Sequence, residues 1–235
     1  MNLKLNLKIR SNKKIITFIF VLLILLVISL YVYTNYIKFY TNIDFGIQDL
    51  KSDIDFNNNG IDDYTDILLG ARLEVKKHPK YKSEYYQNAY PPDGVGVCTD
   101  IIWRAFKNAG YSLRDMINED IELNPKEYNI KNPDKNIDFR RVKNLKIFFE
   151  RYAIKLTKNP NEISQWQAGD IVICNDNHIA IISNKRNKKG QAYIIHHYSS
   201  YQLSLEENTL SRHVITGHYR FDASIIDKNI LKKWA

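Results

Sequence analysis

Cysteine and histidine, two residue types that together can perform nucleophilic catalysis, occur in an ordered pattern along this chain. Cys98 follows a glycine-flanked loop, and the apolar residues after it are spaced as on one face of a helix up to Gly110. The first turn of a helix has unpaired N–H groups and the positive end of the helix dipole, which favour a thiolate. We therefore predict that Cys98 is a candidate nucleophile in the first turn of a helix. The alternative is a small residue buried at a helix start, the commoner role of a single cysteine.

His178 and His196 are candidates for the base that a cysteine nucleophile needs and for the group that orients this base. His178 opens an apolar run with strand character, and His196 lies near the end of the next run, beyond a polar loop over residues 185–190. If that loop closes a hairpin, both histidines lie on neighbouring strands at similar height. A single strand histidine is more often structural, whereas the ordered combination with Cys98 is much more specific. His197 adjoins His196, and strand alternation allows only one of them on a given face.

The elements that would position these residues change character along the chain. Helical spacing comes first, and short apolar patterns typical of strands follow from residue 163 onwards. An order of helices followed by an antiparallel sheet is typical of the α+β class. The predicted helices cover residues 64–77, 98–109, 113–121 and 139–152, and the predicted strands cover residues 171–174, 178–183, 192–198 and 215–221.

Short segments of the sequence resemble the NlpC-type branch of the papain-like cysteine peptidases, which cut peptide bonds in bacterial cell-wall peptidoglycan. The similar segments are Gly-Asp-Ile-Val at residues 169–172, His-Ile-Ala-Ile at 178–181 and Ile-His at 195–196. More closely, the chain resembles the family named domain of unknown function 1287, a relative of that branch. The segments that look like its signatures are residues 96–100, 136–145 and 216–220, and the resemblance covers roughly residues 85–221.

The resemblance implies a papain-like (NlpC-type) fold in which Cys98 is the nucleophile, His178 the base and His196 the orienting residue. The implied substrate is an amide or peptide bond of peptidoglycan, and this chemistry needs no cofactor. One departure concerns the residue before the cysteine, which is Val97 here and an acid in the better-known relatives. Asp100, two positions after the cysteine, is therefore a candidate for substrate binding.

Arg140 and Arg141 are further candidates for substrate binding, because an arginine fork can grip a carboxylate of a peptide stem. The alternative is a salt-bridged helix start in which both arginines accompany Asp138. His218 and Arg220, near the last predicted strand, are expected to be structural.

Residues 55–66 follow the layout of a twelve-residue calcium loop. A hard cation needs six or more oxygens aimed inward, and a glycine at the sixth position allows the sharp turn. The twelfth position holds aspartate where glutamate is usual, and its shorter arm makes bidentate binding less favourable. The alternative is an Asn/Asp-rich turn that caps the next helix. The candidate ligands of a structural Ca²⁺ are Asp55, Asn57, Asn59, the backbone carbonyl of Ile61, Asp63 and Asp66.

The N-terminal segment is first basic and then apolar. Five lysines and arginines and no acid occupy residues 1–14, and residues 15–33 have only Thr17 and Ser29 as polar interruptions. About 20 apolar residues cross a bilayer, and bulky residues stand where a signal-peptide cleavage site needs small ones, so we predict an uncleaved single-pass anchor. The basic flank predicts a cytoplasmic tail at residues 1–14 and an extracytoplasmic location for the rest. Residues 34–52 are expected to form a stalk.

Most of the formal charge of +8 belongs to the tail, which contributes +5. The 221 residues that follow hold 29 basic and 26 acidic side chains, and such a balance gives no support for nucleic-acid binding. The roughly 200 residues after the anchor suffice for one domain with a full core. We expect a calcium-loop-like segment with its helix at residues 53–78 and a papain-like catalytic domain at residues 79–225.

The chain has two cysteines, Cys98 and Cys174, too few for a disulfide scaffold. Cys174 lies in an apolar strand and is expected to be a buried, inert thiol. A disulfide between the two is the alternative, and it would silence the nucleophile. We expect a membrane-anchored extracytoplasmic thiol hydrolase that acts on amide bonds of peptidoglycan peptides. The alternatives are an acyltransferase with the same Cys–His site and a non-catalytic, calcium-stabilised module that binds the cell wall or a partner.

Overall fold

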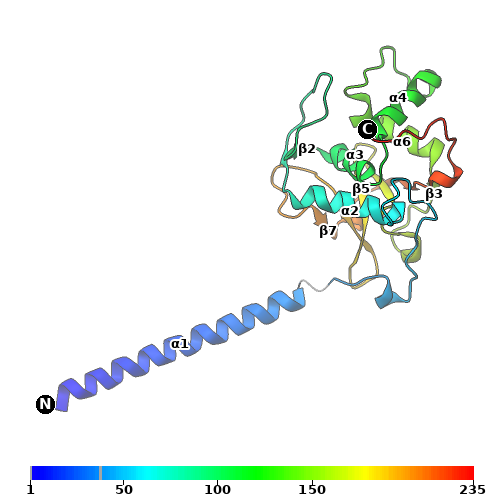
Figure 1. Ribbon diagram of the computed structural model, residues 1–235. Helices are drawn as coiled ribbons and strands as arrows, with labels where there is room; N and C mark the ends of the chain where they lie inside the picture. Colours follow the sequence, from blue (N-terminus) through cyan, green and yellow to red (C-terminus); the bar gives the residue numbers. More distant parts are fainter. Residues whose placement is uncertain (1, 37–38) are drawn as a thin grey trace. The chain divides into compact units, whose positions relative to one another are not determined.

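The computed structural model describes residues 2–36 and 39–235, and the side chains of residues 13–31 and 39–235. The chain divides into two units, Met1–Phe39 and Tyr40–Ala235 (Figure 1). The side chains of the predicted tail up to residue 12 and part of the predicted stalk, residues 37 and 38, lie outside the described residues.

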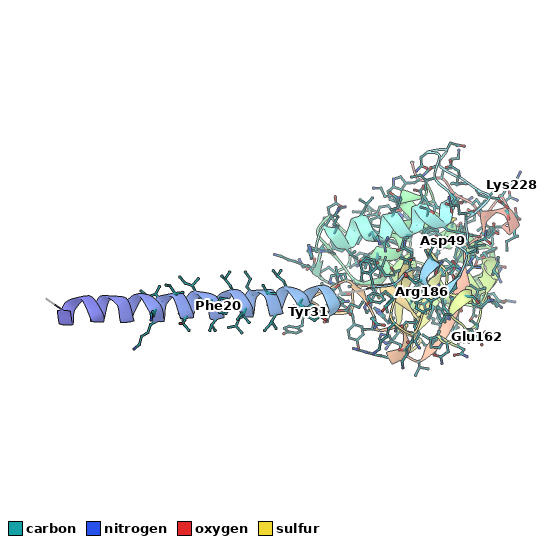
Figure 2. The ribbon with its side chains drawn as sticks, turned by 90° about the horizontal axis from the view of Figure 1, so that it is seen from below. Phe20, Tyr31, Asp49, Glu162, Arg186 and Lys228 are labelled. Atoms are coloured by element: carbon teal, nitrogen blue, oxygen red, sulfur yellow. The ribbon has the colours of Figure 1, made fainter. Side chains whose placement is uncertain are left out.

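A single helix, α1 (Asn2–Tyr36), includes the predicted anchor and most of the predicted tail. Its stretch Lys13–Tyr31 has a mean hydropathy of 2.7 and is exposed throughout. Figure 2 shows its side chains, among them those of Phe20 and Tyr31, projecting from the helix. This stretch is long and apolar enough to span a membrane or to serve as a signal sequence. The orientation of the tail stays a prediction.

The second unit contains a six-stranded sheet in which every pairing is antiparallel. Its strand order is β3-β8-β4-β5-β6-β7, so β4 and β5 lie at its centre. The four predicted strands correspond to β4, β5, β6 and β8, whereas two-residue strands are too short to show an alternating pattern. The strands are β3 (Ile154–Lys155), β4 (Ile171–Cys174), β5 (His178–Arg186), β6 (Ala192–Ile195), β7 (Glu206–Glu207) and β8 (Ile215–Arg220).

Helices cover one face of this sheet. Ile171, Ile173 and Ile179 of the sheet share the main hydrophobic cluster with buried residues of α2, α3, α4 and α6. Alternate residues of the same strands, such as Val172, belong to a second cluster with Trp166 on the other face. The unit is therefore α+β, as predicted. The helices are α2 (Asp63–Lys76), α3 (Cys98–Asn108), α4 (Leu113–Leu123), α5 (Pro125–Tyr128) and α6 (Val142–Tyr152).

Two features fix α3, which begins at Cys98. A short parallel pair, β1 (Lys80–Tyr81) and β2 (Val95–Gly96), leads into it. Further along, α2 and α3 approach closely at Gly70, where an added Cβ would lie 2.5 Å from Cβ of Asn108. Only glycine fits there, and this close packing holds α3 against the rest of the unit.

Residues 40–52, which the sequence predicted as part of a stalk, belong to the second unit. Arg186, 1% exposed, donates to carbonyl oxygens of Ile163, Trp166 and Gly190 and to the side chain of Asn42. A buried guanidinium must satisfy all its donors, and the segment after α1 supplies one of the acceptors. The backbones of Tyr40 and Arg186 are also paired.

Residues 40–235 form one compact unit, and the expected segment bounds at residues 78 and 225 stay a prediction. The calcium-loop-like segment belongs to the same unit as the rest, because the hydroxyl of Tyr111 donates to the Asp63 carboxylate. The C-terminal residues belong to it as well: Ile230 lies in the main cluster, and the N–H of Trp234 donates to the carbonyl of Gly110 at 2.8 Å.

Candidate functional site

Cys98 is the first residue of α3, as the sequence predicts. The Asp100 carboxylate accepts the N–H of Val97 at 2.8 Å and so caps the helix start from its third position. Gly96 allows this arrangement, because an added Cβ would lie 3.0 Å from Cβ of Asp100 and 3.1 Å from Nη1 of Arg104. The cysteine is therefore presented by a tightly held helix start.

The Cys98 thiol is partly exposed, and the backbone N–H groups of Ile179, Thr99 and Cys98 itself lower its pKa. Burial nevertheless raises the pKa of the Cys98 thiol to about 11, because the loss of solvation outweighs these donors. The expected net stabilisation of the thiolate is therefore wrong for this state of the protein. The thiol is protonated at neutral pH.

His178 and His196 lie together, as their positions on neighbouring strands suggest. Nε2 of His178 and Nδ1 of His196 are 2.8 Å apart, and both side chains are buried. Burial lowers the pKa of His178 to about 4 and that of His196 to about 3. Both imidazoles are therefore neutral at pH 7, and each has one N–H donor and one acceptor nitrogen.

Glu207 extends this pair by one residue. Its Oε2 lies 3.2 Å from Nε2 of His196, and Glu207 forms β7 beside β6. The preceding residue, Glu206, anchors β7 through Arg72 at 2.6 Å and Ser183 at 2.5 Å. Sequence reasoning missed Glu207, because a two-residue strand gives no pattern that places a carboxylate beside a histidine.

The group that connects the Cys98 thiol to the histidine pair is a backbone N–H next to His178. The backbone N–H of Ile179, the residue directly after His178, is near enough to the Cys98 thiol to lower its pKa. Within the described part of the chain, no hydrogen bond joins Sγ to the His178 ring, which contacts His196 through its Nε2. Catalytic hydrogen bonds are often long in the absence of substrate. The lack of a hydrogen bond between Cys98 and His178 is therefore compatible with His178 as a general base that approaches the thiol when substrate binds.

His196 and His197 point to different neighbours. The His196 ring contacts His178 and Glu207, whereas the His197 ring packs edge-on against Tyr81 with 5.1 Å between ring centroids. Tyr81 pairs with Gly96 across the β1–β2 ladder and so lies close to Cys98. Strand alternation therefore separates the two histidines as expected, but both sides of the strand border the region around the thiol.

Asp100 and Arg140 bind each other and are not available to grip a substrate. Nε and Nη2 of Arg140 donate to the two Asp100 oxygens at 2.8 and 2.9 Å, and both side chains are buried. The indole of Trp103 also donates to Asp100 at 2.9 Å. The pair holds the start of α3, so we assign it a structural part in place of the expected substrate contact.

Arg141 is the more exposed of the two adjacent arginines. Its Nε lies 3.6 Å from Oδ1 of Asp138, and its side chain is 58% exposed. The alternative of a salt-bridged helix start therefore describes Arg141 with Asp138, whereas Arg140 reaches across to α3.

The Gly-Asp and Thr-Gly-His-Tyr-Arg segments join in one buried cluster. Arg220 donates to both oxygens of Asp170 at 2.7 and 2.8 Å, and Nε2 of His218 lies 3.2 Å from Asp170. The His218 ring stacks on Trp166 with 3.7 Å between centroids. His218 and Arg220 are structural, as expected, because they bind β8 to the start of β4.

The calcium-loop-like segment is tightly turned. Asp55 accepts the N–H groups of Asn59 and Gly60, and the amides of Asn57 and Asn59 donate to Asp66 at 2.8 and 2.9 Å. Asp63, a candidate ligand, instead accepts from Tyr111 and from the N–H of Phe56, and the side chain of Asp62 caps α2. Among the described residues no set of His, Cys, Asp or Glu is placed to hold a metal ion. Calcium binding, including the carbonyl of Ile61, stays a prediction.

Both cysteines are free thiols. Cys174 is fully buried in the second cluster, whereas Cys98 packs against the main cluster on the other face of the sheet. Burial raises the pKa of Cys174 to about 12. The structure therefore contains no disulfide that silences Cys98, and Cys174 is buried as predicted.

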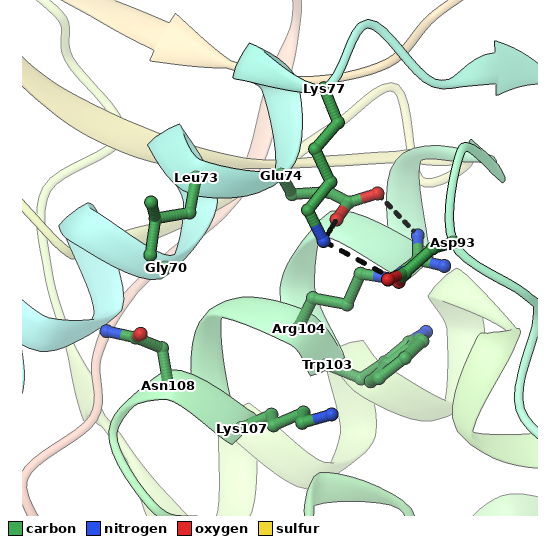
Figure 3. A pocket seen from close by; sticks show the side chains of 9 residues that line it. All are labelled: Gly70, Leu73, Glu74, Lys77, Asp93, Trp103, Arg104, Lys107 and Asn108. Carbon is green, nitrogen blue, oxygen red and sulfur yellow. Dashed lines mark hydrogen bonds and ion pairs between the residues drawn. The ribbon is translucent and has the colours of Figure 1, made fainter.

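A hollow of about 380 Å³ between α2 and α3 holds an ion-pair network (Figure 3). Arg104 binds Glu74 at 2.8 Å, and Lys77 lies 3.3 Å from Glu74 and 3.5 Å from Asp93. Arg104 also donates to the carbonyl of Pro92 at 2.9 Å. The network ties the approach to Cys98 onto α3, and its lining includes neither a cysteine nor a histidine.

Comparison with known proteins gives a family and one relative. The family described as Domain of unknown function (DUF1287) matches residues 68–221. The uncharacterized protein YijF of Escherichia coli (strain K12) is 35% identical over 169 residues, which cover 66% of this chain and 80% of that protein. No solved structure matches. The wider resemblance to NlpC-type peptidases and the papain-like assignment of the fold therefore stay predictions.

Proposed function

The chain belongs to the DUF1287 family, and we propose that it is a membrane-anchored, extracytoplasmic thiol hydrolase of amide bonds with Cys98 as its nucleophile. The observation that carries the proposal is the hydrogen-bonded series Glu207–His196–His178, which ends beside the peptide group that contacts the Cys98 sulfur. A thiol, a base and an oriented base partner are the parts that nucleophilic catalysis requires.

The hydrogen-bonded series Glu207–His196–His178 determines which nitrogen of each imidazole carries the proton. An ionised Glu207 only accepts, so His196 carries its proton on Nε2 and presents a bare Nδ1. That nitrogen accepts the Nε2–H of His178 at 2.8 Å. His178 then has its lone pair on Nδ1, and this is the nitrogen that can take a proton from the Cys98 thiol.

The first step starts from a neutral thiol and a neutral imidazole. When substrate is bound, Sγ of Cys98 attacks the amide carbonyl carbon while the S–H proton moves to Nδ1 of His178. The backbone N–H of Cys98, at the start of α3, is the candidate donor to the oxyanion. His196 and Glu207 stabilise the imidazolium that forms, because both accept along the same series.

The later steps return the site to its starting state. The His178 imidazolium gives its proton to the leaving nitrogen as the carbon–nitrogen bond breaks, which leaves an acyl thioester on Cys98. His178 then takes a proton from water, whose oxygen attacks the thioester, and gives this proton to Sγ of Cys98 as the carbon–sulfur bond breaks. The products are a carboxylic acid and the free thiol, and no oxidant or metal enters the balance.

Peptidoglycan peptides are the proposed substrate. The apolar helix α1 supports a location at the membrane, and the NlpC-type resemblance supports a wall peptide. The test incubates the full chain, in detergent micelles, with muropeptides and follows new products by mass spectrometry. We expect cleavage by the wild type, none by Cys98→Ala, and wild-type cleavage by the matched thiol control Cys174→Ala. Cleavage by Cys98→Ala at the wild-type rate would contradict the mechanism.

Acyl transfer is the second candidate function of the same site. The thioester on Cys98 can meet an amine in place of water, with His178 removing the proton from the attacking nitrogen. A muropeptide assay with and without added D-alanine separates the two, because a transferase gives an aminolysis product in preference to the free acid.

A further inference from the structure

A cavity of about 440 Å³ lies beside the region of Cys98. Residues 78–81 form one wall, and residues from His197 to Leu205 form the other. Tyr81 belongs to the first wall and pairs with Gly96, two residues before Cys98. Burial raises the pKa of Tyr81, and the charge of an ionised Cys98 would raise it further, because the two side chains are near each other. The cavity wall therefore includes Tyr81, a neighbour of the proposed nucleophile.

His197 is an unsatisfied polar residue in this cavity wall. It is 3% exposed, and its Nδ1 is buried without a hydrogen-bond partner. Buried polar groups nearly always have a partner, so a ligand in the cavity is a candidate partner for this nitrogen. Burial lowers the pKa of His197, so the ring is neutral at pH 7 and has one N–H to donate. With no internal partner to fix the tautomer, a ligand can choose which nitrogen carries the proton.

The charge of the lining selects the kind of ligand. Lys80 is the one lysine or arginine of the lining, which contains no aspartate or glutamate. Ser199 adds a neutral hydroxyl, and Leu203, which is 97% exposed, adds apolar surface at the rim. Donors, one positive charge and an aliphatic edge together suit a carboxylate that is attached to a peptide.

We propose that this cavity is the subsite that receives a carboxylate of the peptide substrate, with His197 as a hydrogen-bond donor and Lys80 as the countercharge. The proposal rests on the proposed function and names a residue set for its substrate. It also replaces Arg140 as the expected carboxylate partner, since that arginine is bound to Asp100.

Binding to a form without the nucleophile tests the subsite independently of turnover. The full chain with Cys98→Ala, in detergent micelles, is titrated by calorimetry with the stem tetrapeptide L-Ala-γ-D-Glu-L-Lys-D-Ala. The second titrant is the same peptide with both carboxylates converted to carboxamides. We expect the acid form to bind about tenfold more tightly, the usual effect of one charge-assisted hydrogen bond.

Two added substitutions locate the preference. His197→Phe keeps an aromatic ring against Tyr81 and removes the donor, and it should bring the two peptides to within about twofold of each other. Lys80→Ala should reduce the preference, whereas Lys189→Ala, an exposed lysine outside the cavity, should leave it intact. The pKa of His197, followed by NMR of its ring proton, should rise when the acid peptide binds.

The outcomes separate the subsite from the catalytic proposal. Equal binding of the two peptides, no binding of either at millimolar concentration, or a preference that survives His197→Phe overturns the subsite. Selective binding that is lost with His197→Phe supports it, even if the wild type cleaves no muropeptide, in which case the proposed function fails. Cleavage of muropeptides without carboxylate preference leaves the function standing and removes the subsite.

Discussion

At the residue scale, the chemistry of this site depends on burial more than on the helix dipole. Burial raises the pKa of the Cys98 thiol to about 11 and lowers that of His178 to about 4. A standing thiolate–imidazolium pair is therefore absent, and the thiol has to lose its proton during the attack. The direction of that transfer depends on Glu207, which holds His196 in one tautomer.

Glu207→Gln tests this dependence. A glutamine amide can present an N–H to Nε2 of His196, which would reverse the tautomers of both histidines. We expect kcat/KM for muropeptide cleavage to fall about a hundredfold, since general-base catalysis contributes 10²–10⁴-fold. ¹⁵N NMR of the histidine side chains should report the tautomer change, and Glu207→Asp should retain part of the activity. Unchanged tautomers with unchanged kcat/KM would remove Glu207 from the proton path.

At the scale of elements, the start of α3 is held by a buried ion pair and not by its intrinsic helix propensity. Asp100 caps the helix and receives Arg140 from the turn before α6. The sequence indicated α3 well, because five apolar residues fall on one helical face. It did not indicate the pairing of Asp100 with Arg140, because a separation of 40 positions along the chain leaves their contact undetermined.

Arg140 and Arg141 form a matched pair of test positions. Arg140→Met leaves the buried Asp100 carboxylate without its partner, and we expect a loss of about 3–5 kcal/mol in the free energy of unfolding. Arg141→Met removes a largely exposed charge and should change it by less than about 1 kcal/mol. Urea unfolding curves of the two variants provide the comparison. Similar losses in both would show that the Asp100–Arg140 pair does not hold α3.

The loop over residues 55–66 makes a prediction of its own. If Asp55, Asn57, Asn59 and Asp66 bind Ca²⁺, millimolar calcium should raise the melting temperature, because a ligand that binds only the folded state stabilises it. Magnesium at the same concentration serves as the control, since it dehydrates less readily. An unchanged melting temperature at millimolar calcium would identify the loop as a simple turn that precedes α2.

At the scale of the whole molecule, one α+β unit follows an apolar helix in the sequence, and the sequence predicted the main parts of both. β4 matches its expected bounds, and α3 ends one residue earlier than expected. The packing of residues 40–52 was not predictable, because it follows from the need of buried Arg186 for acceptors. β7 and Glu207 were not predicted either, because both depend on tertiary contacts that leave no local pattern in the sequence.

Stability of the whole unit should fall in acid because of the buried histidines. The pKa values of His178 and His196 are lowered to about 4 and about 3 from an ordinary value of 6.5. The unfolded chain therefore binds more protons below pH 6.5, and the stabilisation present above that pH is lost as the pH falls towards 3–4. Unfolding free energies measured from pH 7 to pH 4 should decline less steeply in a His178→Gln/His196→Gln variant. Equal slopes in the two proteins would contradict the assignment of neutral, buried imidazoles.

The central claim is that Cys98 carries an acyl group during turnover, and intact-protein mass spectrometry tests it most directly. The full chain is mixed with muropeptides, quenched in acid within seconds and weighed, and the modified residue is then located in the peptide that contains Cys98. We predict a thioester adduct on Cys98 in the wild type, a much weaker adduct in His178→Ala and none in Cys98→Ala. Muropeptide cleavage without any adduct, or an adduct on another residue such as Cys174, would contradict this account.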